Sequence, residues 1–365
     1  MKWRLFITLC VLSVLFCALV YNSSNLKDWN RYQPDTERPN SSAVSLISQS
    51  WWSSNGSAKR NESMHFVRIS DADFAMVQSN VTESNMTTKN TEMPKCPDTP
   101  PELVGPLRIV FDEEFSLEKI AELNPYVEFG GHHRPKECNA LQHIAIIIPF
   151  RNRDHHLTHW LYYLHPILRR QQGDYGIYII EQAGKDTFNR AKLLNVGFVE
   201  ALKDVPYDCF IFSDVDIIPL DDRNLYRCSS QPRHLASAMD KFNFRLPYEG
   251  YFGGIVAFTK EQYLKINGFS NSYWGWGTED DDTYKRVVMS GMKVERPERI
   301  IGRTKMIKHE RDKGNEVNTK NYDIYNRMKF TKHLDGYQSL KYRLLKVEKM
   351  HLYTKVTVDI GKPPS

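Results

Sequence analysis

The sequence predicts an α/β fold, a mainly parallel sheet flanked by helices, behind an N-terminal membrane anchor and a disordered stem. Two observations predict it. Buried-strand patterns alternate with helical patterns after residue 95, and a charge-free apolar run near the N-terminus precedes a polar stretch. The 365 residues therefore divide into a cytosolic tail (1–4), an anchor (5–21), a stem (22–95) and a globular body (96–365).

The anchor is the run LFITLCVLSVLFCALVY, which contains no charged residue and follows Lys2 and Arg4. A basic flank before an apolar run is typical of a membrane span whose N-terminus faces the cytosol. A span of 17 residues is short and suits the thinner membranes of the early secretory route. We therefore expect a single-pass type II protein of the Golgi membrane with a luminal body. A cleaved signal peptide is the alternative, although Phe16 before Ala18 fits its small-residue preference poorly.

The stem is rich in serine, asparagine and threonine and shows no apolar periodicity, which is typical of a disordered segment. It holds six N-glycosylation sequons, and none lies beyond it: Asn22, Asn40, Asn55, Asn61, Asn80 and Asn85. Six sequons confined to one polar segment indicate a glycosylated luminal stem. The alternative is a linker that is merely rich in asparagine and serine.

Four cysteines follow the anchor: Cys96, Cys138, Cys209 and Cys228. In the lumen disulfides persist, and four cysteines allow three pairings among which the sequence alone does not choose. A zinc site is the alternative, but the chain contains no CxxC pair. The formal net charge is +5 without a basic tract, which argues against nucleic acid as a partner.

The globular body alternates strands and helices. Residues 143–150, 175–182 and 209–214 are buried-strand runs, whereas residues 155–170 and 188–204 have helical spacing. Strand, helix, strand, helix, strand predicts parallel strands joined by right-handed crossovers. Such sheets bind ligands beyond the carboxyl ends of their strands.

Two acids follow the third strand at that edge. Asp214 and Asp216 lie close to an apolar interior, where carboxylates are costly unless they are protonated, paired or bound to a cation. Arg151, Arg153 and Arg190 are expected at the same mouth, and guanidinium groups suit phosphate oxygens. Acids for a divalent metal and arginines for phosphates indicate a nucleotide sugar. The alternative is a pair of surface-turn acids with solvated arginines.

The segment NSYWGWGTEDDD, residues 271–282, places Trp276 between glycines and then Thr278 before four acids that open a helical pattern. A purely structural interpretation makes Thr278 the helix cap, with the acids complementing the helix dipole. Four acids exceed what a cap requires, tryptophan faces suit sugar rings, and the glycines would let the segment close as a lid. We therefore favour a substrate-binding segment.

Further along, TKMIKHERD spaces Met306 and His309 three residues apart. Histidine is a plausible metal ligand, whereas a thioether is an unusual ligand for a hard ion. Roles in packing and at the surface are the alternative.

Nine motifs stand in the order and nearly the spacing of the animal β-1,4-galactosyltransferases: IIPFRNR, FNRAKLLNVGF, FSDVD, QPRHLASAMDKF, YFGGI, YWGWGTEDDD, GMKVERP, KMIKHERD and YTKVTVDIG. The sequence resembles that family from about Cys96 to its end. The resemblance implies a Rossmann-like GT-A nucleotide-sugar glycosyltransferase fold. It also implies an inverting, Mn²⁺-dependent transfer of galactose from UDP-galactose to the 4-hydroxyl of a terminal N-acetylglucosamine on glycoprotein or glycolipid glycans.

The resemblance assigns roles residue by residue. Asp280 would be the general base, and Asp216, Met306 and His309 the metal ligands. The donor UDP-sugar would be bound by Pro149, Phe150, Arg151, Asn152, Arg153, Phe188, Asn189, Arg190, Asp214, Val215, Asp216, Tyr251, Trp276, His309, Glu310, Arg311 and Asp312. The acceptor would be bound by Thr278, Glu279, Asp280, Asp281, Asn321, Tyr322 and Tyr325. In the family's pattern Cys96 pairs with Cys138, and Cys209 with Cys228.

Donor choice follows from Tyr251, since a tyrosine at this family position favours galactose and a smaller aliphatic residue admits N-acetylgalactosamine. The sequence departs from the family's mammalian founder at four positions. Thr278 stands where the founder has a second glycine, and Asn321, Tyr322 and Tyr325 replace an Arg, a Phe and an Ile. An N-acetylgalactosaminyltransferase and an inactive carbohydrate-binding protein are the alternative functions. A metal-dependent phosphoesterase would need more metal ligands than the sequence offers. A homo-oligomer and a specificity-modifying partner protein stay open.

Overall fold

The structure is a computed structural model that describes residues 93–310 and 312–364. The expected anchor, the six sequons and Arg311 lie outside the described residues. Among the helices of the described part, none combines the length and hydropathy that a bilayer crossing requires.

The strands are β1 (His132–His133), β2 (His143–Phe150), β3 (Asp174–Gln182), β4 (Cys209–Ser213), β5 (Ile217–Pro219), β6 (Arg233–His234), β7 (Ala238–Met239), β8 (Ile255–Thr259), β9 (Arg303–Met306), β10 (Arg343–Lys349) and β11 (Thr354–Asp359). The helices are α3 (Leu117–Leu123), α4 (Asp154–Arg170), α5 (Arg190–Asp204), α6 (Lys260–Lys265), α7 (Glu279–Met289) and α8 (Lys320–Thr331). Two 3₁₀ turns are η1 (Asp240–Phe242) and η2 (Tyr337–Ser339). The predicted strands β2, β3 and β4 and the predicted helices α4 and α5 are confirmed.

The main sheet has the strand order β10-β11-β3-β2-β4-β8-β6, with β1 beside β3. The pairs β11–β3, β3–β2 and β2–β4 are parallel. The outer pairs β10–β11, β4–β8 and β8–β6 are antiparallel, as is β1–β3. The prediction of a mainly parallel sheet is therefore right at the centre and wrong at the edges, where the sheet is mixed. A parallel neighbour needs a crossover, usually a helix, whereas between β4 and β8 the chain passes through loops and the short strands β5, β6 and β7.

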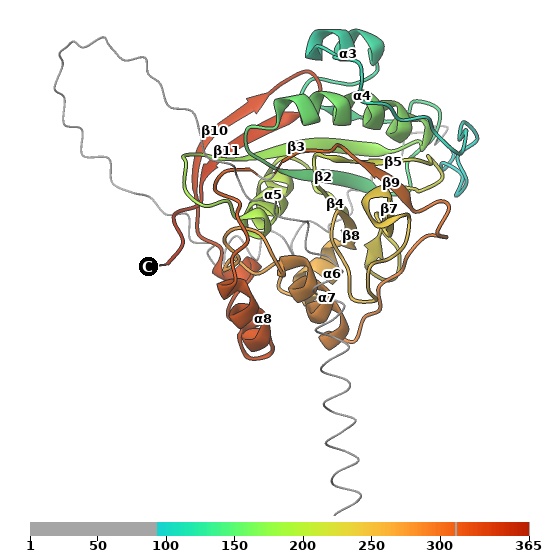
Figure 1. Ribbon diagram of the computed structural model, residues 1–365. Coiled ribbons are helices and arrows are strands. Elements are labelled where there is room, and N and C mark those ends of the chain that lie inside the picture. The colour runs from blue at the N-terminus through green and yellow to red at the C-terminus, as the bar shows by residue number, and fades with distance from the viewer. Residues whose placement is uncertain (1–92, 311, 365) are drawn as a thin grey trace, which may run out of the picture. The chain divides into compact units, whose positions relative to one another are not determined.

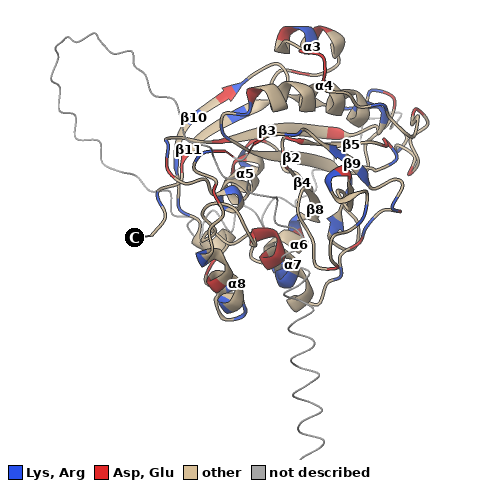
Figure 2. Cartoon of the chain, in the orientation of Figure 1, with Lys and Arg blue, Asp and Glu red and all other residues tan. Residues whose placement is uncertain are grey.

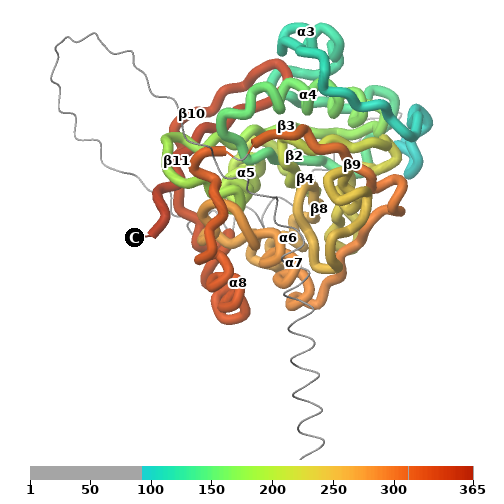
Figure 3. Tube along the Cα trace, viewed as in Figure 1, coloured from blue at the N-terminus to red at the C-terminus, as the bar shows by residue number. Residues whose placement is uncertain are grey.

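Helices cover both faces of the sheet. α4 packs on one face and α5 on the other (Figure 1), and the tube view shows the same layers (Figure 3). A hydrophobic core lies on each face of the sheet, and alternate residues of β2 contribute to the two cores. Ile146 and Ile148 face the α4 side, whereas Ala145 and Ile147 face the α5 side. Gly197 of α5 lies so close to the sheet that a Cβ atom there would overlap the Ile147 side chain. This packing fixes the first residue of α5, Arg190, relative to the carboxyl ends of β2 and β4.

Both disulfides that the resemblance implied are present, Cys96–Cys138 and Cys209–Cys228. The pairing is confirmed. The zinc alternative is wrong for these four cysteines, because each thiol is bonded to another. The second bridge closes the stretch that carries Asp214 and Asp216.

We expect the double variant Cys209→Ala/Cys228→Ala to lose about 3 kcal/mol of unfolding free energy, because opening a loop of this length frees the unfolded chain. Urea denaturation followed by circular dichroism measures the loss. Alanine leaves no polar group in the core, where both cysteines are buried. An unchanged denaturation midpoint would show that the bridge does not stabilise this fold.

Candidate active site

Two loops that carry predicted site residues meet at one edge of the sheet. β2 and β4 are parallel neighbours, with Ile147 opposite Phe212. Residues 151–153 follow β2, and residues 214–216 follow β4. The start of α7 adds a group of acids (Figure 2). The expectation that the segments after β2 and β4 lie at the carboxyl ends of neighbouring parallel strands is confirmed.

Asp214 is paired with an arginine. Arg190 Nε donates to Asp214 Oδ1 at 2.6 Å, and Arg190 Nη1 lies 3.9 Å from Glu279 Oε1. Burial acts to lower the pKa of Arg190, but Asp214 and Glu279 outweigh it and raise that pKa above its ordinary value. Burial raises the pKa of Asp214, against the effect of Arg190. A permanently charged guanidinium therefore joins the acid after β4 to the acids of α7.

Asp216 meets His309 because β5 pairs with β9. Ile217 lies opposite Met306, and the Ile307 amide donates to the Asp216 carbonyl at 2.8 Å. His309 Nε2 then lies 2.8 Å from Asp216 Oδ2. Burial acts to raise the pKa of Asp216, but the contact with His309 outweighs it and lowers that pKa below its ordinary value. The same contact raises the pKa of His309.

These side chains fit a divalent ion. A carboxylate oxygen and an imidazole nitrogen that face each other at 2.8 Å suit two ligands of one ion, with Met306 on the neighbouring strand. Within the described residues, no three side chains of His, Cys, Asp or Glu converge on such a point. An ion held here would therefore keep coordination positions for ligand oxygens, as Mg²⁺-like ions do with substrate phosphates.

Arg151 and Arg153 hold the segments around the site together. Arg153 contacts Asp312 Oδ2 through Nε at 2.9 Å and Nη2 at 2.6 Å, and its Nη2 lies 2.8 Å from His309 Nδ1. Arg151 Nη1 donates to the Asp186 carbonyl at 2.6 Å, and its guanidinium lies 5.0 Å from the Phe188 ring. Both cationic side chains therefore link neighbouring loops, and their contact with phosphate oxygens stays a prediction.

Asp280 and Tyr251 converge above Gly253. A Cβ atom on Gly253 would lie 2.7 Å from Asp280 Oδ2 and 2.9 Å from the Tyr251 hydroxyl. Burial raises the pKa of Asp280, with Arg190 opposing it. Burial and the Asp280 charge raise the pKa of Glu279 to about 7, and the same two causes raise that of Asp281 to about 7. A group of carboxyl groups with raised pKa values is a candidate for general base chemistry.

We expect Gly253→Ala to lower kcat/KM of the enzyme about 100-fold, since the added methyl group would displace the Asp280 carboxylate by an ångström or so. Steady-state kinetics with circular dichroism measures activity and folding together. Gly250→Ala is the matched control, because a Cβ atom there meets nothing closer than 3.4 Å. Equal activity of the two variants would contradict the placement of Asp280.

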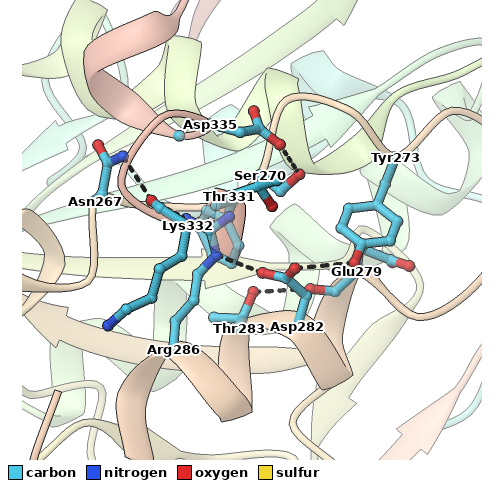
Figure 4. Close-up of polar contacts among 12 residues, drawn as sticks. Asn267, Ser270, Tyr273, Glu279, Asp282, Thr283, Arg286, Thr331, Lys332 and Asp335 are labelled. Atoms are coloured by element: carbon cyan, nitrogen blue, oxygen red, sulfur yellow. Dashed lines mark hydrogen bonds and ion pairs between the residues drawn. The ribbon is translucent and has the colours of Figure 1, made fainter. Parts of the chain in front are cut away.

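A buried network fixes α7 (Figure 4). Arg286 Nε donates to Asp282 Oδ1, Tyr273 donates to Asp282 Oδ2 at 2.9 Å, and Arg286 Nη1 donates to the Lys332 carbonyl at 3.3 Å. The Asp282 and Arg286 side chains are each 1% exposed. The pair anchors the helix that begins with Glu279 and Asp280. Sequence reasoning missed this role, although the i, i+4 spacing of an acid and an arginine was visible.

The segment that carries Trp276 is held by backbone contacts. Trp276 N donates to the Glu316 carbonyl at 2.9 Å, and Gly275 N donates to the Phe188 carbonyl at 2.7 Å. Gly275 and Gly277 have φ values of 71° and 127°, which only glycine adopts readily. Trp276 is 52% exposed. The predicted lid segment is thus tied to its neighbours through its backbone, while Trp276 itself is largely exposed.

Thr278 does not cap α7 with its side chain. Its φ of 66° is left-handed, and its hydroxyl donates to the Asn321 carbonyl at 3.3 Å. Thr278 thus occupies the predicted N-cap position, and its carbonyl accepts from Asp282 N at 3.0 Å, but the side-chain cap bond that the structural interpretation assumed is absent. A β-branched residue in this conformation is strained, and such strain collects at functional sites.

The three residues of α8 that were predicted to bind the acceptor sugar differ in burial. Asn321 is buried, and its amide donates to the carbonyls of Trp274 at 3.3 Å and Gly277 at 3.1 Å. Tyr322 is 59% exposed, and the Tyr325 ring lies 3.5 Å from Lys285 Nζ. Asn321 therefore supports the Trp276 segment, and the tyrosines lie nearer the surface. Their contact with an acceptor stays a prediction.

Several residues that were predicted to bind the donor UDP-sugar have structural roles. Phe150 and Val215 are buried in the core, and Asn189 caps α5 by accepting from Lys192 N at 2.9 Å. Pro149 is the penultimate residue of β2, Asn152 has a left-handed φ of 51°, and the Glu310 carbonyl accepts from Arg153. These residues shape the strand end and the loops, and their contact with a donor stays a prediction.

Sequence reasoning also missed His156 and Lys241. The His156 ring lies 5.2 Å from the His309 ring, and Lys241 acts electrostatically on Asp214, Asp216 and Asp280. The motifs QPRHLASAMDKF and YFGGI held Lys241 and Gly253, but no pattern within them marked these residues as neighbours of the acids.

Comparison with known proteins agrees with this geometry. A family model described as the N-terminal region of glycosyl transferase group 7 matches residues 96–229, and one described as the N-terminal domain of galactosyltransferase matches residues 233–310. The chain is 58% identical to β-1,4-galactosyltransferase 2 of Homo sapiens over 269 residues, which are 73% of this chain and 72% of that protein. It is 57% identical to β-1,4-galactosyltransferase 1 of Mus musculus, over 76% of this chain and 69% of that protein.

Solved structures agree as well. The catalytic domain of Drosophila β-1,4-galactosyltransferase 7, in complex with xylobiose, matches with a TM-score of 0.54 and 29% identity, over 60% of this chain and 95% of that one. A mutant of that enzyme in complex with manganese, UDP-Gal and xylobiose matches with a TM-score of 0.53 and 29% identity, over the same shares of the two chains.

The mixed sheet and the acids and arginines at the carboxyl ends of its strands define a glycosyltransferase with a GT-A-like fold. Two family models and relatives more than half identical specify it further. The chain belongs to the animal β-1,4-galactosyltransferase family and is a hexosyltransferase.

Proposed function

We propose that this protein transfers galactose from UDP-galactose to the 4-hydroxyl of a terminal N-acetylglucosamine, with inversion and with Mn²⁺ as cofactor. The observation that carries the proposal is one arrangement of side chains. Asp216 and His309 form a site suited to a metal ion, the Arg190–Asp214 pair lies at the same edge of the sheet, and Asp280 lies above Gly253. The names of the relatives and the manganese and UDP-Gal in the Drosophila complex support the donor and the cofactor.

Asp280 would accept the proton of the acceptor hydroxyl. Inverting transfer is a single in-line displacement, so one general base suffices and no covalent enzyme intermediate is needed. The raised pKa of Asp280 makes its carboxylate a stronger base than an exposed aspartate. Arg190 holds Asp214 beside the expected donor sugar, and its fixed charge orients the start of α7 through Glu279.

Asp216, His309 and Met306 would hold the ion. A bound Mn²⁺ would neutralise charge on the diphosphate leaving group. The chain's own contribution is to hold the Asp216 carboxylate and the His309 ring side by side. The β5–β9 pairing does so by placing Met306 opposite Ile217.

Tyr251 supports galactose as the transferred sugar. Its ring is fixed edge-on by His234 and Phe242, each 5.5 Å away, and its hydroxyl lies beside Asp280. A rigid tyrosine here would leave little room for a bulky 2-substituent on the donor sugar. The alternative is an N-acetylgalactosaminyltransferase, which would need that room.

A donor screen tests the function. The full-length protein is incubated with N-acetylglucosamine, Mn²⁺ and either UDP-galactose or UDP-N-acetylgalactosamine, and product is measured by mass spectrometry. We expect faster transfer from UDP-galactose, and Tyr251→Leu should raise the relative rate with UDP-N-acetylgalactosamine. Faster transfer of N-acetylgalactosamine by the unaltered protein would overturn the donor assignment. No transfer from either donor would favour an inactive carbohydrate-binding protein.

The same proposal includes the site of action. A type II anchor would hold the catalytic part in the Golgi lumen, where N-acetylglucosamine-ended glycans of glycoproteins and glycolipids are exposed to it. Fluorescence microscopy of the tagged full-length chain beside a Golgi marker tests this location, and residence in the plasma membrane would contradict it.

A further inference from the structure

Two histidines on α4 face each other through the same ring atom. His155 and His159 lie one turn apart, their ring centroids are 4.6 Å apart, and their Nε2 atoms are 3.3 Å apart. Residues at i and i+4 share a helix face, so the helix itself brings the two nitrogens together. Neither side chain belongs to the site described above.

The spacing of the two nitrogens suits a shared metal ion. Two ligands of a tetrahedral Zn²⁺ at about 2.05 Å lie about 3.3 Å from each other. The same distance is long for a direct hydrogen bond between two ring nitrogens, where about 2.9 to 3.0 Å is usual. Imidazole is a preferred ligand of zinc and copper.

His159 is held in place before any ion arrives. The side chain is fully buried, and Phe111 and Phe115 pack edge-on against its ring at 5.5 Å and 5.8 Å. Its Nδ1 has no hydrogen-bond partner among the described residues, so packing alone sets the ring orientation. Burial, with the neighbouring His155, lowers the pKa of His159, and the neutral ring is the form that binds metals.

His155 supplies access. It lies on the exposed side of the helix, so an ion can reach the pair from solvent. Glu114 acts electrostatically on His159 and is itself exposed, which provides negative charge beside the pair. Asp154 is a second acid, in the first turn of α4 beside His155. Its negative charge offsets the positive end of the helix dipole. The nearby Arg153 forms an ion pair with Asp312 and contacts His309.

We propose that His155 and His159 form a second metal site that binds a divalent transition ion of the Zn²⁺ or Cu²⁺ class through their Nε2 atoms. Water, and the Glu114 carboxylate if it turns inward, complete the coordination, because no group of three His, Cys, Asp or Glu side chains converges there among the described residues. The site is separate from Asp216 and His309 and does not depend on the proposed function.

Titration calorimetry of the full-length protein with Zn²⁺, in the presence of saturating Mn²⁺ and UDP, tests the proposal. We expect Zn²⁺ binding that weakens at least about tenfold in His155→Ala, because loss of even a supporting partner costs that much. His155 is exposed, so this variant should fold normally, and circular dichroism verifies it. His351→Ala removes another exposed histidine and should leave the Zn²⁺ affinity unchanged.

Two further measurements separate the sites. The Asp216→Asn variant should keep the Zn²⁺ binding that His155→Ala loses. Electron paramagnetic resonance of one equivalent of Cu²⁺ should show coupling to two imidazole nitrogens, reduced to one in His155→Ala. Equal Zn²⁺ affinity of the unaltered protein and His155→Ala would overturn the proposal and leave the pair as a hydrogen bond. Loss of that binding in Asp216→Asn would also overturn it, by assigning the ion to the other centre.

Discussion

We expect the Asp280→Asn variant to lose about 10²- to 10⁴-fold in kcat for galactose transfer, the range that a positioned general base contributes. Asparagine keeps the size of the side chain above Gly253 but cannot take the acceptor's proton. The fold should be unaffected, because Asp280 is only partly buried and makes no ion pair within 4 Å among the described residues. Steady-state kinetics with UDP-galactose and N-acetylglucosamine measures the loss.

The matched control for this variant is Asp323→Asn. Asp323 is an exposed acid near the start of α8 and contributes nothing to the group of acids at the start of α7. It should transfer galactose at the unaltered rate. If Asp280→Asn kept the same rate as Asp323→Asn, a different group would be the base.

The second large effect is on stability. We expect Arg286→Met to lower the free energy of unfolding by about 3 to 5 kcal/mol, because it leaves the Asp282 charge buried without its partner. Tyr273 still donates to Asp282, but a single neutral hydroxyl does not replace a guanidinium. Urea denaturation measures the loss, and activity should fall with it because α7 carries Asp280.

A double variant identifies the cause of that loss. Arg286→Met/Asp282→Asn removes the unpaired charge and keeps an acceptor for Tyr273, so it should be more stable than Arg286→Met alone. Arg327→Met on exposed α8 is the control and should change stability little. A double variant that is no more stable than the single one would attribute the loss to packing and not to charge.

The central fold could be predicted because its signals are local. The apolar run of β2 and the helical spacing of α4 are each complete within one segment, and their alternation fixes parallel neighbours. The direction of β8 could not be predicted in this way. It depends on how the chain returns to the sheet after β5, and no pattern in residues 255–259 records that path.

The candidate site, too, could be predicted from the sequence only in part. The family motifs marked Asp216, His309 and Asp280 as candidates, and the structure brings Asp216 and His309 into contact. Both disulfides that the resemblance implied are present. Motifs do not record side-chain conformation or burial, however. Asn321 was assigned to an acceptor, but its amide is buried against the Trp276 segment. Thr278 takes the predicted cap position, but with a left-handed backbone and without a side-chain cap bond. Both positions depart from the family's founder, so resemblance gave the least guidance there.

The most direct test of the account is the Mn²⁺ dependence of galactose transfer by the metal-stripped full-length protein, compared between the unaltered chain and Asp216→Asn. We predict no transfer without added ion, and a half-saturating Mn²⁺ concentration at least about tenfold higher in Asp216→Asn, since a lost ligand should cost no less than a lost supporting partner. Full-rate transfer in the absence of metal, or the same Mn²⁺ requirement in both proteins, would contradict the account.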